Sequence, residues 1–263
     1  MAAELQNPIN EKEPLLRGSL FRSLFLAVNS NVKKGYTFIK IFEAGNVFKK
    51  EKESFFQSLH LSGIIYQHEP QITWNQKELA YDFFSLKAEI SQLLQTLGMQ
   101  NIYFQKASPS MPFNKNALDV FFGKQKIAVI GEIDLSVTEK LLKKPAYGFE
   151  IYPEKISLLS KNPEIKKTSK FPLSNRDINI VIKKSIAYQD IENLITSGKI
   201  KYLASFSLIN TFVGKDIPAG FISITLRLVF QSNTKSLQES EINLSMQNLF
   251  RQLEKKLNAK IRS

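Results

Sequence analysis

The stretch RDINIVIKK, residues 176–184, indicates how the second half of the chain folds. Apolar and polar side chains alternate through it, and alternate residues of an extended backbone point to the same side. This pattern is typical of a β-strand with one face in a protein core and the other face exposed. The core side would carry Ile178, Ile180 and Ile182, and the exposed side Asn179, Val181 and Lys183.

The segments that follow predict a complete small domain around this strand. Periodicity and turn residues indicate a helix in 187–198, strands in 201–212 and 220–230, a helix in 238–257 and a strand in 259–262. The order β-α-β-β-α-β is that of the ferredoxin-like fold. Ser236 is expected to cap the second helix, because Glu239 follows three residues later and would complete a capping box.

One face of the predicted sheet must pack on the two helices, and the other face stays open. In the strand 220–230 the residues Phe221, Ser223, Thr225 and Arg227 would lie on the open side. A polar and partly basic sheet face is the kind of platform on which similarly folded modules bind single-stranded RNA. It is also the ordinary solvated face of an antiparallel sheet, so both interpretations stay open.

The first half of the chain predicts an antiparallel sheet with helices packed on it, so the fold class of the whole chain is α+β. Apolar residues at helical spacing, including Leu20 and Leu24, indicate a helix within 17–35. Residues 36–50 are interpreted as two strands around Ala44-Gly45. Residues 117–134 are interpreted as a hairpin that turns at Gly123-Lys124, with its second strand ending at Gly131.

A polar, basic segment that contains Pro163 and Pro172 separates the two halves. We therefore predict a first domain at residues 1–157, a linker at 158–171 and a second domain at 172–263.

The chain has 263 residues, with 36 lysines and arginines against 24 acids, a net charge of +12. After Pro163 there are 16 basic and 8 acidic residues, so +8 lies in the last hundred residues. This bias favours a polyanionic partner, although a lysine-rich solvated surface would give the same count. The absence of cysteine excludes disulfides and thiolate chemistry, and no apolar run approaches the roughly 18 residues of a membrane helix. We expect a cytoplasmic protein.

The sequence shows no recognisable catalytic constellation. It lacks a glycine-rich phosphate loop, a G-x-S-x-G elbow and an H-E-x-x-H motif, and it has only two histidines. The carboxylate pairs Glu132/Asp134 and Glu239/Glu241 fall at a strand end and in the first turn of a helix, where both have ordinary structural roles. We therefore predict no catalytic residue and no metal ligand.

Several motifs resemble a known family in the order in which that family carries them. The stretches NPINEKEPLLRGSL (7–20), IKIFEAGNVF (39–48), YDFFSLK (81–87) and YGFEI (147–151) resemble the catalytic-like core of the bacterial phenylalanyl-tRNA synthetase β subunit. The stretches FPLSNRDINIVI (171–182), GKDIPAGFISITLRLVF (214–230) and KSLQESEI (235–242) resemble the anticodon-binding domain that ends the same subunit.

This resemblance implies a division of roles. The first domain would be an inactive class II synthetase-like core that serves as scaffold and pairs with the catalytic α subunit in an α2β2 assembly. The second would bind the anticodon stem-loop of tRNA(Phe). ATP and magnesium would be used by the assembled ligase, with no cofactor held in this chain. Because the family's β subunits are much longer, we expect this chain to be a C-terminal portion that is not catalytic by itself.

The predicted contact residues follow from charge, the open face and the resemblance. For tRNA we favour Arg176, Lys183, Lys201, Lys215, Arg227 and Arg262, and for the subunit interface Arg17, Leu20, Leu24, Phe42 and Glu43. Asp177 is expected to orient Arg176 or to cap backbone amides, because a carboxylate would repel phosphate. The alternative function is a stand-alone RNA-binding or protein-interaction module, and an enzyme with an unrecognised site is a third hypothesis.

Overall fold

The computed structural model divides the chain into two compact units, residues 1–164 and 165–263. It describes residues 3–4, 15–51, 54–69, 71–74, 76–99, 101–108, 110–134, 136, 142–159 and 169–262. Most of the predicted linker, residues 160–168, lies outside the described residues. Within the described part, no helix is both long and apolar enough to cross a membrane.

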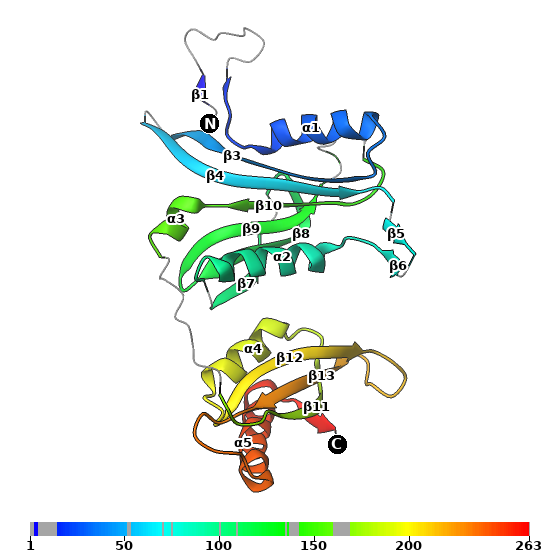
Figure 1. Cartoon of the computed structure of the whole chain (residues 1–263), viewed down its shortest axis with the longest axis vertical. Coiled ribbons are helices and arrows are strands. Elements are labelled where there is room, and N and C mark those ends of the chain that lie inside the picture. Colours follow the sequence, from blue (N-terminus) through cyan, green and yellow to red (C-terminus); the bar gives the residue numbers. More distant parts are fainter. Residues whose placement is uncertain are drawn as a thin grey trace. The chain divides into compact units, whose positions relative to one another are not determined.

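The first unit is built on a six-stranded sheet with the order β3-β4-β10-β9-β8-β7, in which every pairing is antiparallel (Figure 1). Its strands are β3 (Phe38–Glu51), β4 (Ser54–Gln67), β7 (Ile102–Lys106), β8 (Phe113–Phe122), β9 (Gln125–Ile133) and β10 (Ala146–Ile151). Two short pairs accompany it, β1 (Ala3–Glu4) with β2 (Leu15–Leu16), and β5 (Gln71–Thr73) with β6 (Gln76–Leu79). The helices are α1 (Phe21–Lys33), α2 (Phe83–Thr96) and α3 (Pro153–Ser157).

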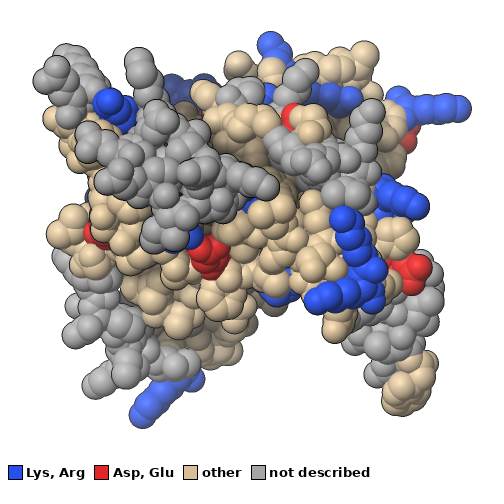
Figure 2. Space-filling view, turned by 90° about the horizontal axis from the view of Figure 1, so that it is seen from above, with Lys and Arg blue, Asp and Glu red and all other residues tan. Residues whose placement is uncertain are grey.

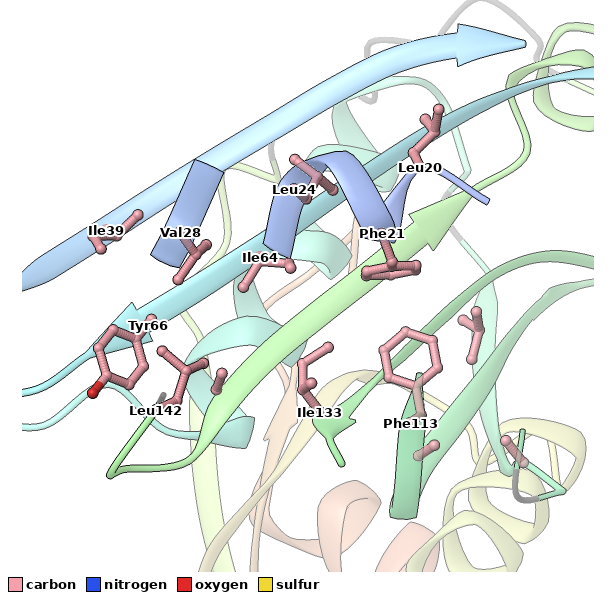
Figure 3. Close-up of a cluster of buried hydrophobic side chains, with 14 of the residues drawn as sticks. Leu20, Phe21, Leu24, Val28, Ile39, Ile64, Tyr66, Phe113, Ile133 and Leu142 are labelled. Atoms are coloured by element: carbon pink, nitrogen blue, oxygen red, sulfur yellow. The ribbon is translucent and has the colours of Figure 1, made fainter. Parts of the chain in front are cut away.

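Both faces of this sheet are covered, and each face has its own core. On one face, the α1 residues Phe21, Leu24 and Val28 pack with alternate residues of the strands, as Figure 3 shows. The Phe21 and Phe113 rings meet edge to face, with centroids 5.4 Å apart and planes at 84°. On the other face, α2 and α3 bury a second cluster that includes Leu86, Ile90 and Ile156. This explains why residues 62–66 of β4 are buried on both sides of the strand.

Two strand boundaries differ from the sequence prediction. β3 runs without a break through Ala44-Gly45 and pairs with β4 along its whole length. The Arg17 guanidinium occupies the space where a side chain at position 45 would lie. β9 continues through Gly131 to Ile133, and Gly131 is the position where the Phe113 ring approaches the backbone. In both places glycine marks a close approach of another group and not the end of a strand.

The second unit has the predicted order β-α-β-β-α-β, so the ferredoxin-like prediction is confirmed. Its antiparallel sheet has the strand order β12-β13-β11-β14. The elements are β11 (Ser174–Lys183), α4 (Tyr188–Ser197), β12 (Leu203–Phe212), β13 (Phe221–Phe230), α5 (Glu239–Leu257) and β14 (Lys260–Arg262). The predicted isoleucines of β11 are buried together with Leu226 and Leu228 against both helices. Each such buried side chain contributes about 1.5–3 kcal/mol.

The capping prediction for α5 is wrong by two residues. The helix begins at Glu239 with Gln238 as its N-cap residue, and the Glu241 carboxylate accepts a hydrogen bond from the Gln238 backbone N–H at 3.3 Å. Glu239, the predicted capping residue, instead pairs with Arg176.

Substitution of Gly131 by alanine tests the close packing of the α1-side core. A Cβ atom there would lie 2.7 Å from Phe113 Cδ1 and 3.0 Å from the Ala117 Cβ. Because Phe113 is buried, we expect Gly131→Ala to lower the free energy of unfolding by about 1–3 kcal/mol in urea titrations. Gly18→Ala is the control, since its nearest neighbour would be the Phe48 carbonyl at 3.7 Å, and it should change stability by less than about 0.5 kcal/mol. Equal effects from both variants would contradict this packing.

Candidate RNA-binding face of the second unit

The sheet of the second unit has one face without a helix, which we call the open face. Strand register assigns residues to it, because residues directly opposite each other on antiparallel strands share a face. Asp177 pairs with Arg227, Asn179 with Thr225, Val181 with Ser223 and Lys183 with Phe221. The open face therefore includes Asn175, Asp177, Asn179, Val181 and Lys183 of β11; Ser205, Ser207, Asn210 and Phe212 of β12; Phe221, Ser223, Thr225, Arg227 and Val229 of β13; and Lys260 and Arg262 of β14.

Arg227 lies on the open face as predicted, but an acid partner holds it. Its Nε and Nη2 atoms donate to the two carboxylate oxygens of Asp177 at 2.8 and 2.7 Å, a bidentate pair across two strands. The hydrogen bond from Arg227 lowers the pKa of Asp177, and the same bond raises the pKa of Arg227, so both groups stay charged. Asp177 therefore orients Arg227, which corrects the expectation that it orients Arg176.

Arg176 lies on the helix side of the sheet and not on the open face. It pairs with Leu228, whose side chain belongs to the helix-side core. Its Nη2 atom forms an ion pair with the Glu239 carboxylate at the start of α5, and its Nη1 atom donates to the Asn175 carbonyl at 2.8 Å. In this position Arg176 joins the first strand to the second helix, which is a structural role.

Arg262 ties a loop across the open face. Its Nη2 atom donates to the Asp216 carbonyl at 2.9 Å, and Asp216 lies in the loop 213–220 between β12 and β13. β11 separates β13 from β14, so this bond draws the loop over β11, because adjacent strands are only about 4.8 Å apart. Val181 of β11 and Ile217 of the loop are both buried although neither belongs to the helix-side core. The loop is the segment placed to cover that part of the open face.

The three predicted lysines fall in three different places. Lys183 is exposed on the open face at the end of β11, and Lys215 is exposed in the loop that Arg262 holds. Lys201 precedes β12 and lies beside α5, with its Nζ atom 4.8 Å from the centre of the Tyr202 ring. The structure therefore brings Lys183, Arg227 and Arg262 to one face, adds Lys215 at its edge, and separates Arg176 and Lys201 from them.

Phe212 is a candidate contact that the sequence analysis missed. It is 53% exposed, and its register opposite Ser223 puts it on the open face. The chain turns back so closely that a Cβ atom on Gly214 would overlap the Phe212 ring. Glycine at this position therefore lets the backbone pack against the ring. Simple alternation from Phe206 would place Phe212 in the core. A register shift between Leu208 and Asn210 turns it outward, and no sequence signal marks that shift.

Some of the predicted subunit-interface residues of the first unit are buried, and others are exposed. Leu20 is fully buried and Leu24 is 3% exposed in the α1-side core, which leaves them no surface for a partner. Arg17 donates to the Glu43 carboxylate at 2.6 Å, and this pair fixes the chain entering α1 to β3. Phe42 is 73% exposed and lies on the other face of β3 from Glu43.

An exposed groove runs beside α1. It is a hollow of about 420 Å³, with Leu26 62% exposed, and its lining is apolar at Phe21, Phe25, Leu26, Met111 and Pro112 and polar at Ser19, Arg22 and Asn29. Figure 2 views the molecule from the α1 side and shows scattered lysine and arginine side chains and a few acidic ones, with uncharged residues between them. Leu26 is thus a better candidate for a protein contact than the buried Leu20 or Leu24.

The acid pairs considered for catalysis have structural partners. Glu132 accepts a hydrogen bond from the Asn116 side chain at 2.8 Å, and Asp134 accepts one from the Ser136 backbone N–H at 2.9 Å. Among the residues that the structure describes, no three His, Asp or Glu side chains are grouped so that they could hold a metal ion.

Comparison with known proteins agrees with these two units. Residues 1–152 match the family model described as "Phenylalanyl tRNA synthetase beta chain CLM domain", and residues 169–262 match "Ferredoxin-fold anticodon binding domain". The chain is 29% identical to the phenylalanine–tRNA ligase beta subunit of Wigglesworthia glossinidia brevipalpis, covering 98% of this chain and 32% of the relative. It is 26% identical to that of Lactobacillus acidophilus, covering 98% and 33%. It is 28% identical to the chloroplastic beta subunit of Phaeodactylum tricornutum, covering 98% and 38%.

Among solved structures, a pyrrolysyl tRNA synthetase of Desulfitobacterium hafniense is similar with a TM-score of 0.44 and 15% identity, over 60% of this chain and 52% of that chain. The sequence matches place the chain in the class of aminoacyl-tRNA synthetase subunits. Within that class, it belongs to the family of phenylalanyl-tRNA synthetase beta chains. It spans about a third of the length of the curated relatives that it matches.

Removal of the Asp177 charge tests whether the open face meets an anion. Asp177→Asn takes away the carboxylate that neutralises Arg227. We expect it to tighten binding of a short RNA hairpin severalfold and to steepen the dependence of affinity on salt, both measured by fluorescence anisotropy. Glu69→Gln in the first unit makes the same change in net charge and should have a smaller effect. RNA binding that is equal or weaker in Asp177→Asn would exclude Arg227 as a contact.

Proposed function

We propose that this chain works as part of the beta subunit of a phenylalanine–tRNA ligase. Its second unit binds the anticodon stem-loop of tRNA(Phe), and its first unit is a non-catalytic scaffold that contacts the alpha subunit in an α2β2 assembly. The proposal rests above all on the match of residues 169–262 to an anticodon-binding domain. In this chain, the open face of that unit carries an exposed aromatic ring and basic side chains. We place the assembly in the cytoplasm, with ATP and magnesium used at the alpha subunit.

The open face has the two features that unpaired RNA bases require. Phe212 offers an exposed ring on which a base can stack, and its position is fixed by the turn at Gly214. Lys183 and Lys215 are exposed and make no ion pair with a described residue, so they are available to phosphates. Arg227 is held by Asp177 and can give a phosphate only part of its charge.

The scaffold role of the first unit follows from its packing. Both faces of its sheet are filled by apolar clusters, and Glu132 and Asp134 accept hydrogen bonds from Asn116 and Ser136 within the fold. Leu26 and Phe42 are two of the exposed apolar side chains of this unit, and Leu26 lies in the groove beside α1. Exposed apolar patches of this kind are frequent at protein interfaces.

Replacement of Phe212 tests base stacking directly. We expect Phe212→Ala to weaken RNA hairpin binding between about 5- and 100-fold, because stacking on an aromatic side chain contributes about 1–3 kcal/mol per base. The slope of affinity against salt should stay unchanged, since no charge is lost. Phe55→Ala removes an exposed ring from β4 in the first unit and serves as the matched control. A Phe212→Ala variant that binds as tightly as the control variant would rule out the stacking role.

Two charge insertions test the contact with the alpha subunit. Leu26→Asp and Phe42→Asp each put a carboxylate into exposed apolar surface, and burying it at an interface is unfavourable. We expect at least one of them to weaken co-purification with the alpha subunit by about tenfold or more. Leu158→Asp, at a side chain that is 84% exposed, should leave it unchanged. If neither variant differs from Leu158→Asp, the interface lies elsewhere.

A pyrophosphate-exchange assay tests whether the first unit is a non-catalytic scaffold. The chain without the alpha subunit should show no phenylalanine-dependent exchange of pyrophosphate into ATP, and addition of the alpha subunit should restore it. Exchange by this chain alone would refute the claim.

A further inference from the structure

The second unit has a groove on the helix side of its sheet, apart from the open face. It has a volume of about 390 Å³ and lies between the turn that precedes β12 and one side of α5. Lys201 and Tyr202 form one wall, and the other wall consists of Glu241, Leu244, Ser245, Gln247, Asn248 and Arg251.

The two cations of the groove resemble Lys183 and Lys215 of the open face in having no acid partner among the described residues. Lys201 and Arg251 are exposed, and neither forms an ion pair with a described residue. Arg176, Arg227 and Lys235, in contrast, are all paired with acids. The ion pairs of this unit thus leave Lys201 and Arg251 uncompensated.

The acid in the groove, Glu241, already has three partners. Glu241 forms an ion pair with Lys235 at 2.7 Å, accepts a hydrogen bond from the Tyr202 hydroxyl at 3.4 Å and accepts another from the Gln238 backbone N–H. The hydrogen bond from Lys235 lowers the pKa of Glu241, so it stays ionised with its charge balanced. It neither repels an incoming anion as a bare carboxylate would nor binds Lys201.

The amide at Asn248 adds a donor. The Gln252 side-chain amide donates both to the Gly198 carbonyl at 3.3 Å and to Asn248 Oδ1 at 3.2 Å. This bond uses the oxygen of Asn248 and leaves its NH₂ group free to donate. The groove therefore offers the Lys201 and Arg251 cations and the Asn248 amide as donors, and such donors are the groups that recognise an anion.

The turn that carries Lys201 is held in an unusual conformation. Lys199 and Tyr202 both have positive φ values, 45° and 63°, which are unfavourable for side chains with a Cβ atom. The Gln231 backbone N–H donates to the Tyr202 carbonyl at 2.9 Å and secures the turn. The Tyr202 hydroxyl donates a hydrogen bond to Glu241 of α5, which fixes the Tyr202 ring. The Lys201 ammonium group lies over this ring and beside α5.

We propose that this groove binds the sugar-phosphate backbone of RNA, as a second contact separate from the open face. The inference rests on the proposed RNA-binding function of this unit and assigns the phosphate contacts to Lys201, Arg251 and Asn248. The open face binds unpaired bases at Phe212, and the groove binds the backbone of the adjoining stem. RNA is favoured over an acidic protein because closely placed single cations and amide donors suit a phosphodiester, and the unit matches an anticodon-binding domain.

A double substitution tests the groove. Lys201→Gln with Arg251→Gln removes two charges and keeps the side chains polar and of similar length. In fluorescence anisotropy with an RNA hairpin, the double variant of the full chain should bind about three- to tenfold more weakly. The slope of affinity against salt should fall by about 1 for each cation lost. Thermal unfolding by circular dichroism verifies that the fold is kept.

The control is Lys124→Gln with Lys143→Gln, which makes the same change of net charge on exposed lysines of the first unit. If the groove variant and this control bind RNA equally, the groove inference is wrong, while RNA binding through the open face stands. If the unsubstituted chain binds no RNA hairpin, the proposed function fails and the groove inference with it. Phe212→Ala separates the two sites, because it should lower affinity without changing the salt slope.

Discussion

The burial of one face of the four-stranded sheet against α4 and α5 is the constraint on which the candidate site depends. Because strand residues alternate between faces, burying Ile180 of β11 and Leu226 of β13 decides the side of every other residue on those strands. Arg227 is thereby turned to the open face and Arg176 to the helices. A slip of one residue in the register would exchange these roles.

Charge in this unit is divided between groups that hold the fold and groups that remain available. Arg176 joins β11 to α5, Arg227 joins β13 to β11, and Arg262 ties the loop 213–220 to β14. Exposed ion pairs of this kind contribute little to stability individually, but here they set the positions of elements around the open face. The lysines that have no acid partner in the described part of the chain, such as Lys183 and Lys201, are the ones that a polyanion can use. A count of basic residues cannot make this distinction, because it depends on partners distant in the sequence.

Much of the fold could be predicted from the sequence because it follows from local periodicity. The alternation of isoleucines in β11, the helix predicted within residues 17–35, and the order of elements in the second unit all agree with the structure. The errors have one common cause, since each depends on a residue distant in the chain. Gly45 accommodates Arg17 within a continuous strand, Glu239 pairs with Arg176, and the bulge before Asn210 turns Phe212 outward. Periodicity shows that Leu20 and Leu24 belong to an apolar stripe, but it does not show that the sheet of the same unit covers this stripe.

The central claim is that the second unit is the RNA-binding part of this chain. Photo-cross-linking tests it most directly. The full chain is cross-linked to an RNA hairpin with thiolated bases in its loop and stem, and the linked peptides are then mapped. We predict that loop bases link to β12 near Phe212 and that stem positions link to α5 near Arg251. Cross-links confined to the first unit, residues 15–159, would contradict it.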